Sequence, residues 1–139
     1  MQSLTYNNTH WVLNASHPVA KGPNSNYAGL NIPLSAGTWE ISVQAHISTA
    51  STSGPGFRIE FGFLISGTTS PIKQVLGERE ADKEFSEIGH FTRIVYVEEP
   101  VTLTFITSVA ADAPDLELKA GRTPTFMKCQ RIIRESITL

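Results

Sequence analysis

The chain has 139 residues, of which 40% are hydrophobic and 17% charged, and 11 Lys and Arg against 13 Asp and Glu give a formal net charge of −2. This composition is typical of one globular domain and excludes disordered, collagen-like and membrane-spanning chains. Because the sequence lacks a cluster of Lys and Arg that would neutralise phosphates, we expect no nucleic-acid partner.

Neither the start of the chain nor its single cysteine indicates secretion or a membrane. Residues 1–6 contain neither the basic nor the apolar stretch of a signal peptide, and no apolar run approaches the length that crosses a bilayer. We therefore expect no signal peptide and no membrane insertion. Cys129 has no partner for an internal disulfide, and its apolar neighbours predict an inert thiol in the core.

Alternating apolar and polar residues predict strands through most of the chain, because successive side chains of a strand point to opposite faces. The clearest run is 38–48, in which Trp39 and Ile47 begin and end an apolar face and Trp39 belongs to the core. In chain order, about eight strands are predicted, at residues 9–13, 27–34, 38–48, 57–66, 91–97, 101–109, 116–118 and 125–133.

The segments between these strands are rich in Gly, Pro, Asn, Asp and Ser, as turns require. Pro100, after two glutamates, predicts a tight hairpin between strands 91–97 and 101–109. Residues 75–88 are predicted to form a charged loop. Residues 1–25, rich in Asn, Ser and Thr, are predicted to be an N-terminal arm or linker before a sandwich of residues 26–139.

No helical periodicity, internal repeat or alternation of strand and helix interrupts this pattern. The predicted fold class is therefore all-β, an antiparallel β-sandwich that is jelly-roll-like, in a single domain.

Several strands have apolar residues on both faces, although a lone sandwich needs to bury only one face of each sheet. The residues on the second face are Leu64, Ile94, Tyr96 and Ile106. They form either a subunit interface or a surface that loops or the N-terminal arm cover, and the sequence leaves both interpretations open.

Enzyme motifs are absent. The sequence has no nucleophile elbow, P-loop, zincin pair or dinucleotide-binding glycine pattern, and its four histidines are scattered. Because a metal site needs at least three converging ligands, we predict no metal, no cofactor and no enzymatic activity. Glu80 and Glu84 leave a glycan hydrolase open, since that chemistry uses paired carboxylates, but the mixed charges around them favour a solvated face.

The turn and strand at 34–41 (LSAGTWEI), the two long aromatic-rich strands that follow, and the closing segment 123–132 (TPTFMKCQRI) resemble the C-terminal sandwich domains of bacteriophage tail fibres and tailspikes. They are also similar to the wider group of trimeric C1q/TNF-like jelly rolls. The resemblance extends over residues 27–134 and implies a homotrimer at the tip of a virion fibre, extracellular after release. It also implies contact with a bacterial surface glycan or protein, but no functional residue is carried over from it.

A receptor surface would lie on loops that a rigid sandwich supports. The candidate loops are 50–56, 67–71, 77–87 and 111–115, and the receptor-binding residues predicted within them are Arg79, Asp82, Lys83, Asp112 and Asp115. Two alternatives stay open. One is a monomeric carbohydrate-binding module with Trp11 or Tyr27 in the contact, and the other is a purely structural baseplate or capsid-decoration domain of a virion.

Overall fold

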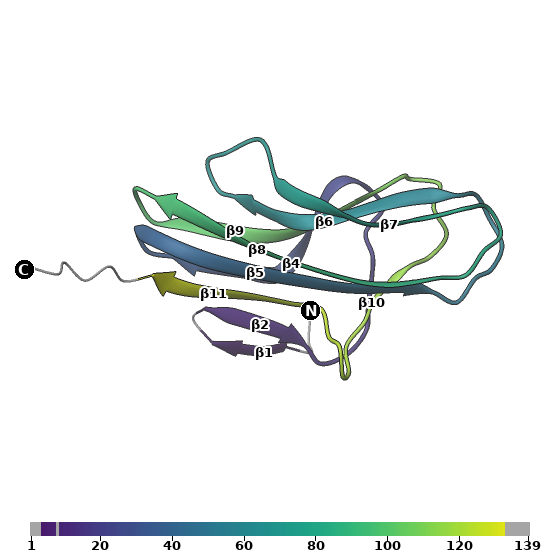
Figure 1. Cartoon of the computed structure of the whole chain (residues 1–139), viewed down its shortest axis with the longest axis horizontal. Coiled ribbons are helices and arrows are strands. Elements are labelled where there is room, and N and C mark those ends of the chain that lie inside the picture. The colour runs from purple at the N-terminus through teal and green to yellow at the C-terminus, as the bar shows by residue number, and fades with distance from the viewer. Residues whose placement is uncertain (1–3, 8, 133–139) are drawn as a thin grey trace, which may run out of the picture.

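Two antiparallel sheets pack face to face in the computed structural model, which describes residues 4–7 and 9–132 (Figure 1). Sheet A contains, side by side, β1 (Leu4–Asn7), β2 (His10–Leu13), β11 (Phe126–Ile132), β5 (Gly37–Thr49) and β8 (Phe85–Val97), with the short β10 (Glu117–Leu118) and β3 (His17–Pro18) beyond one end of β11. Sheet B contains β4 (Gly22–Leu34), β9 (Val101–Val109), β6 (Phe57–Ile65) and β7 (Ile72–Arg79) in that order. None of the described residues forms a helix that would cross a membrane.

The strand order is that of a jelly roll. Apart from the short β1, β3 and β10, sheet A has the order β2-β11-β5-β8 and sheet B the order β4-β9-β6-β7. In each sheet, strands that are far apart in the chain therefore lie side by side, as two Greek keys wrapped into a sandwich require. This arrangement confirms the predicted all-β, antiparallel, jelly-roll sandwich.

The core lies between the two sheets and follows the alternation of β5. Trp39 begins the inward face of that strand, and the four inward residues after it, through Ile47, have no exposed surface. Phe61, Phe63 and Phe105 come from sheet B and are also fully buried. A core built from long inward faces makes a rigid support for loops at both ends of the sandwich.

The segment predicted to be an N-terminal arm is part of the sandwich from β2 onward. β2 pairs with β11, and its Trp11 is fully buried with its ring edge-on to Phe105, the two ring centroids 5.4 Å apart. Val19 is buried as well. No structural boundary therefore falls at residues 25/26, while residues 1–3, 8 and 133–139 lie outside the described residues.

Two further expectations are corrected. Residues 75–88 are not a charged loop, because β7 continues to Arg79 and β8 already begins at Phe85. The turn at Pro100 is not a hairpin, since it joins β8 in sheet A to β9 in sheet B. The first difference arises because β7 and β8 are edge strands with much exposed surface, so their apolar periodicity is weak. The second arises because the local chemistry of a turn does not show which sheet the next strand joins.

Candidate functional site

Three of the four candidate loops meet at one end of the sandwich. Thr49 Oγ1 donates a hydrogen bond to the Asp115 carbonyl (2.8 Å), and the backbone amides of Gly54 and Asp82 donate to the Asp82 side chain (2.9 Å) and the Gly54 carbonyl (3.0 Å). We call the surface formed by residues 50–56, 80–84 and 110–116 the loop end. Loop 67–71 lies at the opposite end, where the Ser66 amide donates to the Thr102 carbonyl (2.9 Å).

Arg79 holds the loop end together from inside. Its side chain is 4% exposed, and its guanidinium lies 5.0 Å from the centroid of the Phe57 ring. It donates hydrogen bonds of 2.7 to 3.4 Å to the carbonyl groups of Ser51, Ser53, Pro55 and Lys83. The expectation that Arg79 contacts a receptor is therefore corrected, because this side chain is buried and its charge is directed at the loops.

The other four residues predicted to bind a receptor are exposed at the loop end. The Asp82 carboxylate is engaged by the Gly54 amide, in a backbone with the left-handed φ of 61°. Asp115 forms an ion pair with Lys21 at 3.1 Å. Lys83 and Asp112 also lie in this surface. The structure thus brings together Asp82, Lys83, Asp112 and Asp115, residues that two separate loops contribute.

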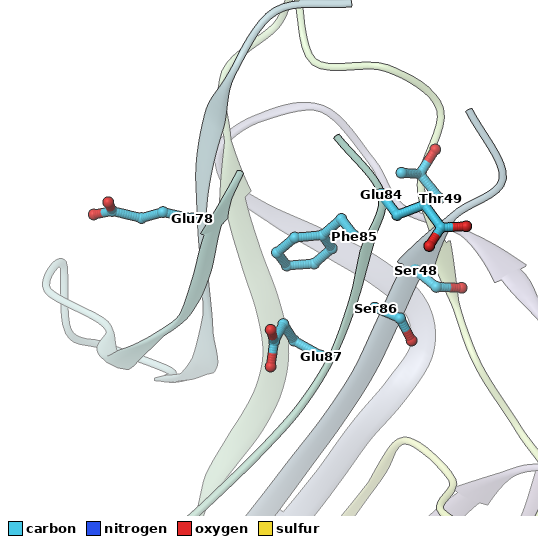
Figure 2. A pocket seen from close by; sticks show the side chains of 7 residues that line it. All are labelled: Ser48, Thr49, Glu78, Glu84, Phe85, Ser86 and Glu87. Atoms are coloured by element: carbon cyan, nitrogen blue, oxygen red, sulfur yellow. The ribbon is translucent and has the colours of Figure 1, made fainter. Parts of the chain in front are cut away.

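An acidic groove of about 390 Å³ lies between β7 and β8, next to the loop end (Figure 2). It is lined by Ser48, Thr49, Glu78, Glu84, Phe85, Ser86 and Glu87. Figure 2 shows Glu78 pointing away from Phe85 and Glu84 lying beside Thr49, so the carboxylates do not converge. Glu80 is not part of the lining. Within the described part of the chain, no group of three or more His, Cys, Asp or Glu is placed to hold a metal ion.

The outward face of β8 is the most apolar exposed surface of the described residues. Four large hydrophobic residues of the described chain are exposed. Three of them lie on this face: Ile88 (49%), Ile94 (62%) and Tyr96 (69%). His90 and Thr92 lie between Ile88 and Ile94 on the same face. We call Ile88, His90, Thr92, Ile94 and Tyr96 the β8 face. A hollow of about 510 Å³ at its end is lined by Thr38, Ile94, Tyr96 and Ile132.

The four residues predicted to form an interface do not share one surface. Ile94 and Tyr96 lie on sheet A, whereas Leu64 and Ile106 belong to β6 and β9 of sheet B. Leu64 is half-buried and Ile106 is only 1% exposed. Ile88, which was predicted to lie in a charged loop, is instead exposed on the same face as Ile94 and Tyr96. Ile88 is an even number of positions from Ile94 and Tyr96, and this spacing could have placed all three on one face of a strand.

Two charged residues on the inward side of β8 restrict how this edge strand can associate. Glu87 and Arg93 pair in register with Ile47 and Ile41, so they point to the same side of sheet A as the core, yet both are exposed at the rim of the sandwich. Inward-pointing charges on an edge strand oppose the addition of another strand. The edge of β8 is therefore protected against pairing with another strand, whereas its outward face is uncovered in this chain.

The two aromatic residues considered for sugar stacking are in the core. Trp11 is fully buried and Tyr27 is 5% exposed. The Tyr27 hydroxyl accepts a hydrogen bond from the Ala20 amide (3.0 Å) and is hydrogen-bonded to Thr107, and burial raises the pKa of Tyr27. Neither ring is available to a glycan. Cys129 is buried as predicted, and burial raises the pKa of its thiol to about 12.

The sequence matches no known protein-family model, and a search of curated proteins finds no match. A function is therefore inferred from the physical features of the domain. Two surfaces are distinctive: the charged loop end, which Arg79 makes rigid, and the neutral apolar β8 face.

Proposed function

We propose that this domain is a non-enzymatic, homotrimeric module at the tip of a virion fibre or tailspike. In this proposal, the β8 face holds the trimer together and the loop end binds a bacterial surface glycan or protein. The observation that carries it is the alignment of Ile88, Ile94 and Tyr96 on the outward side of one strand. The resemblance to phage fibre domains and C1q/TNF-like jelly rolls supplies the virion setting and the number three.

The chemistry of the β8 face suits contact with further copies of the same chain. In a trimer, residues close to the threefold axis lie near their equivalents in the other copies, so a charged face packed around that axis would repel its copies. The β8 face contains no Lys, Arg, Asp or Glu. Exposed apolar side chains gain about 25 cal/mol for each Å² removed from water, and a face of this kind is typical of a subunit interface.

Association through the β8 face leaves the loop end accessible. β8 runs along the side of the sandwich from the loop end, at Phe85, to the opposite end, at Val97 (Figure 1). The loop end lies at the tips of the strands, so copies that meet side by side present their three loop ends in the same direction. Three weak contacts with a cell surface then act together, which raises the overall affinity well above that of one copy.

The test of assembly is the mass of the double variant Ile94→Ser/Tyr96→Ser in sedimentation equilibrium. We expect the unmodified protein to sediment as a trimer and the double variant as a folded monomer. Val75→Ser is the matched control, because Val75 is a 37% exposed hydrophobic residue on β7, away from the β8 face, and it should leave the trimer intact. A double variant that keeps the mass of the unmodified protein contradicts the interface.

The test of binding uses fluorescently labelled protein with intact bacterial cells and with purified lipopolysaccharide. Lys83→Ala/Asp112→Ala alters two exposed side chains of the loop end and should reduce adsorption while the trimer remains. A monomer that binds glycan would identify a carbohydrate-binding module instead. A trimer that adsorbs to no cell would identify a purely structural domain of the virion.

A further inference from the structure

His90 is the titratable residue of the β8 face. It lies between Ile88 and Thr92 on the outward side of the strand, and its side chain is exposed. Its ring centroid is 5.9 Å from that of Phe126 on β11, with the rings nearly perpendicular, and its Nε2 is 3.4 Å from the Thr92 hydroxyl. The imidazole is therefore held against an aromatic ring and a hydroxyl, with no carboxylate among these contacts.

Few carboxylates on the neighbouring strands lie close enough to His90 to neutralise a positive charge on its imidazole. On β5, the residue opposite His90 is Gln44. His46, opposite Ile88, follows on the same face towards the loop end, and Glu40, opposite Ile94, lies on that face in the other direction. On β11, Lys128 pairs with Ser42, and on β2, His10 pairs with Lys128. Among these groups, the Lys128 ammonium carries charge of the same sign as a protonated His90.

We propose that His90 makes assembly through the β8 face sensitive to pH, so that the trimer forms at neutral pH and dissociates in mildly acidic solution. This inference rests on the proposed trimer. Formation of the trimer through the β8 face would remove three imidazoles from water. Burying an uncompensated charge is costly, and like charges in a medium of low dielectric repel strongly, so the assembled state favours neutral imidazoles.

The sign of the effect follows from proton linkage. Histidine changes its charge between pH 5 and 8, so in acidic solution the separated copies bind protons that the trimer excludes. Each trimer then releases up to three protons as it forms, one from each copy. A process that releases three protons becomes up to about 1,000-fold less favourable for each unit by which the pH falls.

The experiment is sedimentation equilibrium of the full chain at pH 7.5 and pH 5.0, at one protein concentration, with near-ultraviolet circular dichroism to establish that the chain stays folded. We expect a trimer at pH 7.5 and folded monomers at pH 5.0. His90→Gln, which is neutral at both pH values, should remain a trimer at both. His46→Gln is the matched control: His46 lies on the same sheet face but its Nδ1 is bound to the Thr123 carbonyl (2.9 Å), so this variant should dissociate like the unmodified protein.

The outcomes separate this inference from the proposed function. An unmodified protein that is monomeric at pH 7.5 overturns both. A trimer at pH 7.5 that persists at pH 5.0 supports the proposed assembly and overturns the role of His90. Dissociation of His90→Gln to the same extent as the unmodified protein also overturns that role, because another group would then be responsible.

Discussion

Arg79 provides a sharp test of how the loop end is held in place. Arg79→Met keeps an unbranched side chain of similar length but removes every donor of the guanidinium. Two of its hydrogen bonds are short, to the carbonyl groups of Pro55 (2.7 Å) and Lys83 (3.0 Å), and two are long, to those of Ser51 (3.3 Å) and Ser53 (3.4 Å). The substitution therefore leaves carbonyl groups of two loops without this partner.

The magnitude follows from the geometry. The two short bonds involve a charged donor and contribute about 1.5 kcal/mol each, and the contact with the Phe57 ring adds about 1 kcal/mol. Burying the guanidinium also costs free energy, because its charge is desolvated and its Nε has no hydrogen-bond partner. The substitution removes this cost, which offsets part of the lost stabilisation. We expect Arg79→Met to lower the free energy of unfolding by about 3 kcal/mol.

The assay is urea denaturation followed by tryptophan fluorescence, at one protein concentration so that association does not differ between samples. Arg58→Met is the matched control. Arg58 lies on the adjacent strand, its side chain is 58% exposed, and its 3.9 Å ion pair with Glu60 is at the surface, so this variant should cost less than about 0.5 kcal/mol. If Arg79→Met destabilises the protein no more than Arg58→Met does, the buried guanidinium does not hold the loops.

Three further predictions concern packing, ionisation and the accessibility of the thiol. An added Cβ at Gly62 would collide with the backbone carbonyl oxygen of Ile72 and lie 2.7 Å from Lys73 Cα, so Gly62→Ala should cost about 2 to 4 kcal/mol in urea denaturation. Gly67→Ala, where no atom lies within 4 Å and only the φ of +85° is unfavourable, should cost about 1 kcal/mol, and equal costs would contradict the close approach of β7 to β6. Because burial raises the pKa of Cys129 from 9.0 to about 12 and also raises that of Tyr27, the folded state keeps protons that the unfolded chain loses, and stability should fall as the pH rises above about 9. The native thiol should also resist iodoacetamide at pH 8 until urea unfolds the chain, whereas alkylation at the unfolded rate under native conditions would show that Cys129 is accessible.

The central strands could be predicted from the sequence because burial on one side imposes a period of two. From Trp39 to Thr49, β5 alternates between buried and partly exposed residues, and Trp39 and Ile47 are in the core as predicted. The edge strands carry a weaker signal. In β8, only Phe85, Phe91 and Val97 are buried, a spacing of six residues that hides the alternation.

The remaining differences depend on contacts between residues far apart in the chain. A turn such as the one at Pro100 has the same local chemistry whether the next strand pairs with the last or crosses to the other sheet. Arg79 resembles a surface charge until the carbonyl groups of the loop 50–56 surround it. Ile106 is hidden by long-range packing in the same way, whereas Ile94 and Tyr96 stay exposed because they lie on the outward face of β8.

The most direct test of the central claim, that copies of the chain associate through the β8 face, is the absolute mass of the unmodified protein at neutral pH by light scattering over a dilution series. A trimer has three times the chain mass of 15.2 kDa, so we expect about 46 kDa, maintained on dilution. A mass of 15.2 kDa at every concentration would contradict it and return Ile88, Ile94 and Tyr96 to the status of isolated surface residues.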